Sequence, residues 1–158
     1  MVFILSKKPQ TETTRSKEVK IIARQVITLD DVAKDSRKLK LLYTLSEYGP
    51  ISEKTVYNLI YELKNKGIDL NYEFYTIAKN LTSRDLSNDL LSLKYTGLVE
   101  VDNRKRIVVS TLGKEFLNNN IGKIPEGERN NIRTIINEIK PKLKATDLEV
   151  EAKLRKTR

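Results

Sequence analysis

The amino-acid sequence predicts an α+β fold that is mostly α-helical and carries one small β-hairpin. Leucine and isoleucine side chains recur at spacings of three and four residues in several segments, which places them on one face of a helix. Residues 98–109 instead contain two short β-prone runs separated by a polar turn. With 158 residues, of which 39% are hydrophobic, the chain can form one domain with a core. We expect a central domain at 29–120, an N-terminal arm at 1–28 and a helical C-terminal extension at 121–158.

Positive charge is concentrated at the two ends of the chain. Residues 1–28 contain six Lys or Arg and two acidic residues, and residues 140–158 contain seven and three, so each end carries +4. Residues 29–139 contain 17 basic and 16 acidic residues, which leaves them +1 of the total of +9. A basic balance indicates an anionic partner, either nucleic acid or a membrane surface. We expect the tails to supply most of the attraction to a polyanion and the folded part to supply shape.

No targeting or membrane segment is predicted. The apolar opening at 1–5 is far too short for a signal peptide, and Lys7 and Lys8 follow it. No stretch has the run of apolar residues that is needed to cross a bilayer. We therefore expect a cytoplasmic, nucleoid-associated protein without a membrane partner.

The composition argues against catalysis. Cysteine and histidine are both absent, so the chain lacks a thiolate nucleophile, the usual general base near neutral pH and the commonest metal ligand. Carboxylates such as Asp30, Asp31 and Glu73 occur, but their spacing does not indicate a paired site. We expect no enzyme activity, no cofactor and no metal.

Two segments precede the first predicted helix. Residues 6–18 are polar and lack periodicity, which predicts a mobile arm that could lie along a minor groove. Residues 18–29 are rich in β-branched side chains. They form either a strand at the edge of the hairpin or the start of a helix.

The first predicted helix begins at the acidic pair Asp30-Asp31 and runs to Tyr48. Either aspartate can accept hydrogen bonds from the free amides of a helix start. One face is apolar and contains Leu41, Leu42, Leu45 and Tyr48. Gly49 and Pro50 end this helix.

The second predicted helix follows a short strand at Ile51. Ser52 opens the helix, which runs through Lys66 and ends at Gly67. Its inward face consists of Val56, Leu59, Ile60 and Leu63. The spacing of these residues predicts burial against the first helix.

The residues between the second and third helices are rich in aromatic side chains. Tyr72, Phe74, Tyr75 and Ile77 either cover the core between the helices or form a stacking platform for bases. A platform needs cations between its rings, and only Lys79 is nearby in the sequence. We therefore favour burial in the core.

The third predicted helix, at 83–95, has distinct inner and outer faces. Leu86, Leu90 and Leu93 recur at spacings of four and three, which places them inside. The outer face carries side chains that can reach base edges or phosphates, namely Arg84, Asn88, Ser92 and Tyr95. Asp85 and Asp89 lie on or near this face. They would repel phosphates unless they pair with Arg84 or Lys94 or accept a hydrogen bond from cytosine. The alternative is that they belong to an ordinary solvated helix face.

A basic hairpin is predicted directly after this helix. Gly97 supplies the left-handed residue that commonly closes a helix. Residues 98–101 and 107–109 are the two strands, and Asp102 and Asn103 make the turn between them. Three cations at or just after the turn, Arg104, Lys105 and Arg106, would lie at its tip.

Two more helices are predicted after the hairpin. The first runs from Thr111 to Leu117, and the asparagines at 118–120 stop it. Residues 121–127 contain two glycines and a proline, which indicates a loop. The second helix begins at Glu128.

The last predicted helix carries a narrow apolar stripe, made of Ile132, Ile135, Ile136 and Ile139. Such a stripe either docks on its own domain or pairs with a second copy of the chain. Many modules that read DNA use terminal helices to set the spacing of two half-sites, so we favour a homodimer with this stripe as its interface. Pro141 interrupts the stripe. The apolar residues beyond it are too scattered among Lys and Arg to predict whether the same helix continues.

The order of helix, Gly-Pro, helix, third helix and basic hairpin resembles the winged helix-turn-helix proteins, especially the small archaeal transcription regulators. The motif residues are Tyr95-Thr96-Gly97-Leu98-Val99-Glu100 and, after the hairpin, Thr111-Leu112-Gly113-Lys114. This resemblance covers residues 36–117. The segment GIDLNYEF at 67–74 is also similar to a group called YwgA-like winged-helix proteins, for which DNA binding is not implied.

The resemblance implies a transcription regulator or chromatin-associated factor that binds double-stranded DNA. Arg84 and Asn88 would read bases, because Arg pairs with guanine and Asn with adenine through two hydrogen bonds in the major groove. Ser92, Lys94 and Tyr95 would contact the DNA backbone, and the basic hairpin would be the wing. Winged helices also dock on proteins. The alternative is therefore a protein-interaction subunit of a larger nucleic-acid-processing or partition assembly.

Overall fold

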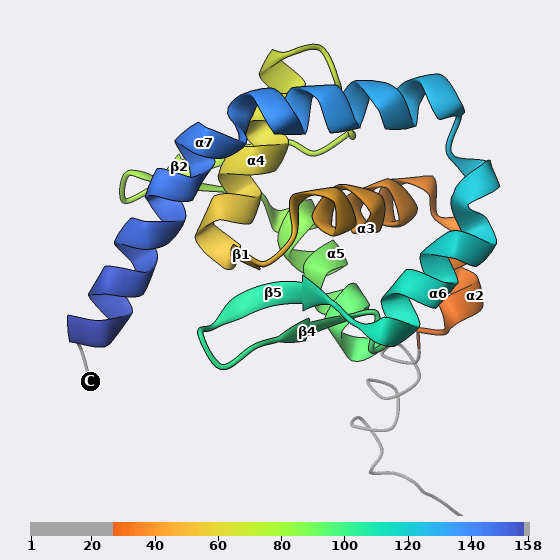
Figure 1. The fold of residues 1–158 in the computed structure, drawn as a ribbon, viewed down its shortest axis with the longest axis horizontal. Helices are drawn as coiled ribbons and strands as arrows, with labels where there is room; N and C mark the ends of the chain where they lie inside the picture. The colour runs from red at the N-terminus through yellow and green to blue at the C-terminus, as the bar shows by residue number, and fades with distance from the viewer. Residues whose placement is uncertain (1–26, 157–158) are drawn as a thin grey trace, which may run out of the picture.

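The computed structural model describes residues 27–156, which form the α+β arrangement shown in Figure 1. The chain is mostly helical with a small antiparallel sheet, as predicted. The predicted arm at 6–18 and most of the β-rich run at 18–29 lie outside the described residues.

The elements follow one another along the chain in a simple order. The first half contains α2 (Leu29–Lys34), α3 (Ser36–Tyr48), β1 (Ile51–Ser52), α4 (Glu53–Asn65), β2 (Tyr75–Ile77) and β3 (Asn80–Thr82). The second half contains α5 (Arg84–Tyr95), β4 (Val99–Val101), β5 (Arg106–Val109), α6 (Thr111–Asn120), a 3-10 turn (Ile121–Lys123) and α7 (Glu126–Lys156).

The first predicted helix is in fact two helices that meet at Asp35. Thr28 caps α2 and exchanges hydrogen bonds with Asp31, which forms a capping box. Asp35 has an extended backbone, with φ −99° and ψ 102°, and its side chain accepts hydrogen bonds from the amides of Arg37 and Lys38. The prediction of one helix from Asp30 to Tyr48 is therefore wrong at its N-terminal end. An aspartate that caps a new helix start competes with continuing the old helix.

The core lies among α3, α4 and α5, where the predicted leucine spacings are confirmed. The predicted inward residues of α4 and α5 are all buried, namely Val56, Leu59, Ile60, Leu63, Leu86, Leu90 and Leu93. Gly67 has a φ of 99° and follows the last turn of α4, as predicted. The amide of Ile68 then returns to the Leu63 carbonyl at 2.9 Å, which closes the helix end.

The aromatic link between α4 and α5 divides into a buried part and an exposed part. Tyr72 is buried, and Phe74 packs against the core. Tyr75 and Ile77 are exposed, so the prediction that they cover the core is wrong. They belong to a hairpin, β2–β3, that the sequence analysis did not predict.

The three-stranded sheet has the order β1-β5-β4 and is antiparallel throughout. Ile51 pairs with Ile107, and Val101 pairs with the same residue from the other side. The predicted short strand at Ile51 and the hairpin at 98–109 are thus confirmed.

Packing explains the glycine of the Thr111-Leu112-Gly113-Lys114 motif that follows the hairpin. Ser110 donates a hydrogen bond to the Gly97 carbonyl at 2.6 Å and accepts one from the Gly113 amide at 3.0 Å. A Cβ at position 113 would collide with the Leu98 carbonyl oxygen, so this close approach of α6 to the sheet requires glycine. The start of α6 is therefore locked to the base of the hairpin.

The last helix is longer than predicted and covers the domain. It begins at Glu126 and continues through Pro141, while residues 118–120, which were predicted to end α6, are helical. Figure 1 shows α7 lying across α4 and α3 and then changing direction towards β1, as a proline inside a helix produces. Leu143 and Asp147, beyond the bend, are buried.

The isoleucine stripe of α7 packs on its own domain. Ile132, Ile136 and Ile139 are buried within the single chain, and Ile135 packs against the same core. The prediction that these four residues form a homodimer interface is therefore wrong, because side chains buried in one copy are not available to a second. Of the two alternatives for the stripe, docking is the one observed.

Candidate nucleic-acid interface

The outer face of α5 is exposed along its whole length. Ser83 caps the helix by accepting a hydrogen bond from the Leu86 amide at 3.3 Å. From this start the helix presents an exposed face that contains Arg84, Asp85, Ser87, Asn88, Leu91 and Tyr95. Arg84, Asn88 and Tyr95 are therefore where the sequence analysis placed them.

Ser92 does not lie on this face, which corrects the prediction. Its side chain is buried and donates to the Asn88 carbonyl at 3.1 Å. A row of residues four apart rotates by about 40° at each step, so the third member of the row from Arg84 has turned towards the core. Leu91, which is 64% exposed, takes its place.

The last turn of α5 has one engaged cation and one exposed aromatic residue. Lys94 is partly buried and pairs with Glu53 of α4 at 3.3 Å. Tyr95 is 61% exposed. Of the predicted backbone contacts, Tyr95 is thus open, and Lys94 already has an acidic partner.

The tip of the β4–β5 hairpin presents two cations. The Asp102 carboxylate accepts hydrogen bonds from the amides of Arg104 and Arg106 at 2.9 and 2.8 Å, and from Arg106 Nε at 2.9 Å. Lys105 adopts a left-handed conformation, with a φ of 65°. Arg104 and Lys105 are exposed and form no ion pair within residues 27–153. Arg106 is engaged by Asp102, so two of the three predicted wing cations remain free.

The hydrogen bonds in this turn also change the acidity of Asp102. Burial acts to raise the pKa of its carboxyl, but the Arg106 and Arg104 amides and the Arg106 side chain outweigh burial and lower it. The carboxylate therefore stays charged at neutral pH and holds the turn closed.

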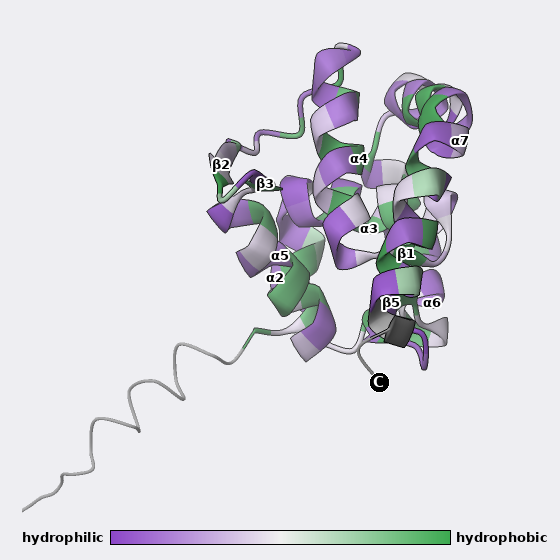
Figure 2. Ribbon diagram, turned by 90° about the vertical axis from the view of Figure 1, so that its left-hand side faces the viewer, coloured by the Kyte–Doolittle hydropathy of each residue, from purple (hydrophilic) through white to green (hydrophobic). Residues whose placement is uncertain are grey.

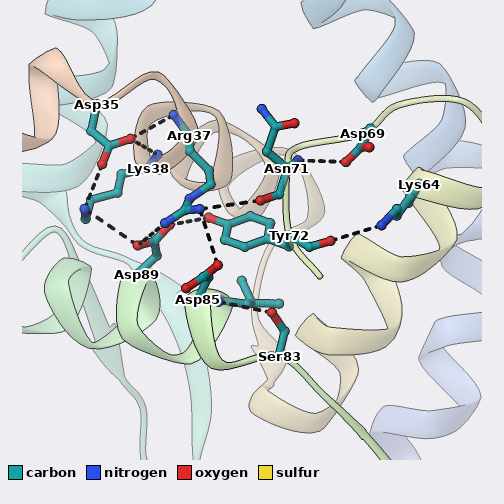
Figure 3. A network of polar contacts seen from close by, with 11 residues as sticks. Asp35, Arg37, Lys38, Lys64, Asp69, Asn71, Tyr72, Ser83, Asp85 and Asp89 are labelled. Carbon is teal, nitrogen blue, oxygen red and sulfur yellow. Dashed lines mark hydrogen bonds and ion pairs between the residues drawn. The ribbon is translucent and has the colours of Figure 1, made fainter. Parts of the chain in front are cut away.

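A buried polar cluster fixes the inner side of α5, as Figure 3 shows. Arg37 Nε donates to Asp89 at 2.8 Å, and the Tyr72 hydroxyl donates to the same carboxylate at 2.6 Å. Lys38 Nζ lies 3.6 Å from Asp89. Asp89 is thus not a solvated acid on the outer face but the centre of a cluster that joins α3, the link and α5.

The members of this cluster stabilise one another's ionisation states. Burial acts to lower the pKa of Arg37, but the hydrogen bond and charge of Asp89 outweigh burial and raise it. Burial and the neighbouring Asp89 both raise the pKa of Tyr72 far above its ordinary value, so its hydroxyl stays a neutral donor. The guanidinium carbon of Arg37 also lies 4.9 Å from the centre of the Tyr72 ring, within cation–π distance.

Asp85 is the remaining acid on the outer face of α5. Its carboxylate lies 3.8 Å from Arg37, and its side chain is half exposed. Arg37 thus lies within ion-pair distance of both aspartates of α5, which reduces their repulsion of a polyanion. Sequence reasoning had considered only Arg84 and Lys94 as partners. Arg37 lies 52 residues from Asp89, and no local pattern relates two such positions.

The described residues contain no candidate metal centre. No group of three or more His, Cys, Asp and Glu that could hold a metal is found among them. None of the described helices is long and apolar enough to span a bilayer.

No protein-family model, curated protein or solved structure matches this chain. The resemblance to winged helix-turn-helix proteins therefore remains a prediction. The case for a function rests on the geometry of α5 and the β4–β5 hairpin.

Proposed function

We propose that this protein binds double-stranded DNA through a winged helix-turn-helix fold, as a transcription regulator or a chromatin-associated factor. One observation carries the proposal: Arg84 and Asn88 are exposed on α5, and this helix contacts β4 of the hairpin that follows it, whose tip has two cations without ion-pair partners in the described chain. A base-reading helix beside a phosphate-contacting hairpin is how such modules dock on duplex DNA.

The topology supports this assignment. The order α3, β1, α4, α5, β4, β5, with β1 pairing to β5, is the order expected of a winged helix. The insertion of β2–β3 between α4 and α5 is the main departure. The hairpin tip at Arg104 and Lys105 would be the wing.

Each side chain on the proposed surface has a distinct role. Arg84 can pair with guanine and Asn88 with adenine, because each forms two hydrogen bonds with the base edge in the major groove. Tyr95, Arg104 and Lys105 would contact phosphates and set the register. The basic ends of the chain would add attraction that does not depend on sequence.

The proposal is tested by measuring duplex affinity against salt for the full chain and three variants. We expect Arg84→Ala to lose discrimination between a selected and a random duplex, by about 1–3 kcal/mol for the lost contact. Lys105→Ala should weaken binding to both duplexes equally and reduce the salt slope by about one.

Lys114→Ala is the matched control, because Lys114 is an exposed lysine of α6 without an ion pair in the described chain. It should change neither discrimination nor the salt slope. Equal, salt-independent binding by all four proteins would refute the proposal.

A protein-docking role is the second candidate, and the exposed Leu91 and Tyr95 favour it. An apolar pair at 64% and 61% exposure on the face proposed for DNA is a feature of protein contacts. Leu91→Ser distinguishes the two roles. If Leu91→Ser leaves duplex affinity unchanged and Arg84→Ala loses discrimination between the selected and the random duplex, DNA reading is supported. If no variant alters duplex binding, the docking role is favoured.

A further inference from the structure

The hairpin inserted between α4 and α5 has an exposed tip and a fixed base. β2 and β3 pair from Tyr75 with Thr82 to Ile77 with Asn80. The two turn residues, Ala78 and Lys79, both have positive φ values, 52° and 69°. A two-residue turn with φ positive at both positions matches the twist of a hairpin, but it usually requires Asn or Gly. The fold thus holds a tight turn that these side chains do not favour by themselves.

The base of this hairpin is anchored in the domain. Phe74 packs edge-to-face on Tyr61 of α4, with ring centres 5.4 Å apart and planes at 76°. At the other end, Thr82 leads directly into Ser83, the buried cap residue of α5. The hairpin is therefore joined to the N-terminus of α5 without a flexible segment.

The exposed residues of the hairpin combine apolar and cationic groups. Tyr75 is 45% and Ile77 is 59% exposed. Lys79 is exposed and forms no ion pair within residues 27–153. The hairpin tip thus has an exposed cation, Lys79, close in sequence to an exposed apolar side chain, Ile77. This combination suits the edge of a DNA groove, where phosphates flank sugar and base surfaces.

The hairpin lies at the N-terminal end of α5 and also contacts α4. Thr82 of β3 is followed directly by Ser83, which caps α5, and β3 packs against α4. Figure 1 shows the β2–β3 and β4–β5 hairpins projecting from the same side of the molecule, and Figure 2 looks onto that side.

The docking geometry of a recognition helix decides what this hairpin would meet. Such a helix contacts base edges with its N-terminal residues. The segment just before that N-terminus then lies at the groove wall, and a three-residue strand reaches about 10 Å beyond it. A rigid hairpin at this place would meet the duplex near the N-terminal end of α5, whereas the wing follows its C-terminal end.

We propose that the β2–β3 hairpin is a second DNA contact, with Lys79 on a backbone phosphate and Ile77 against the sugar edges of the flanking groove. The inference rests on the proposed function and adds a contact that extends the site beyond α5 and the wing. A protein partner for this tip is the competing outcome.

Footprinting of full-length protein on a long duplex tests the inference. Lys79→Ala should lower affinity about 3- to 10-fold, reduce the salt slope by about one and remove protection on one flank only. Lys105→Ala should remove protection on the other flank. Ile77→Ser should weaken protection on the same flank as Lys79→Ala, with no change in salt slope. Lys114→Ala is the control.

Shortening the duplex supplies an independent check. When the flank that Lys79 protects is removed, wild type and Lys79→Ala should bind equally, whereas Lys105→Ala should still bind more weakly. Circular dichroism and thermal unfolding of each variant report whether the fold is retained. An Ala78→Gly variant, which relaxes the turn and keeps both contact residues, should bind as wild type does.

The outcomes separate the two proposals. If Lys79→Ala and Ile77→Ser bind as wild type does while Lys105→Ala is weaker, the hairpin inference fails and the proposed function stands. If those two variants instead alter only self-association in sedimentation experiments, the hairpin is a protein contact and the inference also fails. If wild type protects no duplex, the proposed function itself fails.

Discussion

Two aspartates near the candidate interface each accept a hydrogen bond from an arginine, but they position different parts of it. Asp89 lies on the buried side of α5, and Asp102 lies in the turn of the β4–β5 hairpin. Asp89 accepts a hydrogen bond from Arg37 Nε at 2.8 Å, and Asp102 accepts one from Arg106 Nε at 2.9 Å. The Asp89 side chain is 3% exposed and its partner lies 52 residues away, whereas the Asp102 side chain is 22% exposed and its partner lies four residues away.

The Asp89–Arg37 and Asp102–Arg106 pairs differ in the part of the molecule that each one holds in place. The Asp89 cluster connects three elements, so it sets the orientation of α5 relative to α3. The Asp102 pair acts within one turn, so it sets only the shape of the hairpin tip. It occupies Arg106 and leaves Arg104 and Lys105 exposed. Removing one partner of a buried ion pair leaves the other charge buried and uncompensated, which destabilises the fold. An exposed ion pair contributes little to stability.

Asp89→Asn should have the largest effect on stability. The change removes the charge that Arg37, Lys38 and Tyr72 share, so we expect the free energy of unfolding to fall by about 2–3 kcal/mol, less than a fully buried pair would lose because Arg37 is partly exposed. Urea unfolding measures this loss. Asp85→Asn, at the more distant and half-exposed acid, is the control and should cost about 0.5 kcal/mol or less. Equal losses for the two variants would contradict the distinction.

Tyr72→Phe should have an intermediate effect. It removes one hydrogen bond to a charged acceptor and leaves the ring in place, so we expect a loss of about 1.5–2 kcal/mol in the free energy of unfolding. Combining it with Asp89→Asn tests their coupling. The double variant should lose less than the two single losses together, because both remove the same bond. Strict additivity would show that the hydroxyl and the carboxylate act independently.

Asp102→Asn should have the smallest effect on global stability, about 0.5 kcal/mol, with a local effect on the hairpin tip. Because the folded state lowers the pKa of Asp102, its stabilisation is present above the unfolded pKa of about 3.9 and is lost as the pH falls through the folded pKa. Protection factors of the Arg104 and Arg106 amides, which correct for the pH dependence of intrinsic exchange, should therefore fall in acid for wild type. The asparagine side chain in Asp102→Asn keeps an oxygen that can accept from these amides but does not titrate, so the protection factors of this variant should show no acid transition, and a wild-type transition in the variant would contradict this assignment.

Sequence reasoning succeeded where the signal was local. The spacing of Leu86, Leu90 and Leu93 predicted the inner face of α5, and the β-prone runs around Asp102 predicted the β4–β5 hairpin. It failed at Ser92, because counting in steps of four ignored the rotation of that row around the helix. It also failed at Asp35, where a cap competes with a continuing helix.

The larger errors concern docking between distant segments. The isoleucine stripe of α7 was correctly identified as an apolar face, but the choice between a second copy and the chain's own core depends on where α3 and α4 lie. The sequence did not predict whether the helix continues past Pro141, and the structure shows that it bends there and continues to Leu143 and Asp147. Asp147 then accepts a hydrogen bond from the Ser52 amide at 3.0 Å, a contact that spans 95 residues.

The sequence by itself determined the apolar helix faces and the basic hairpin, because these depend on side chains within a few positions of one another. Only the tertiary structure decided that Asp89 is buried by Arg37 and Tyr72, that α7 covers its own domain, and that the link projects a hairpin. These features depend on burial and on charge pairs between residues far apart in the chain, whose stabilisation appears only after the elements have packed.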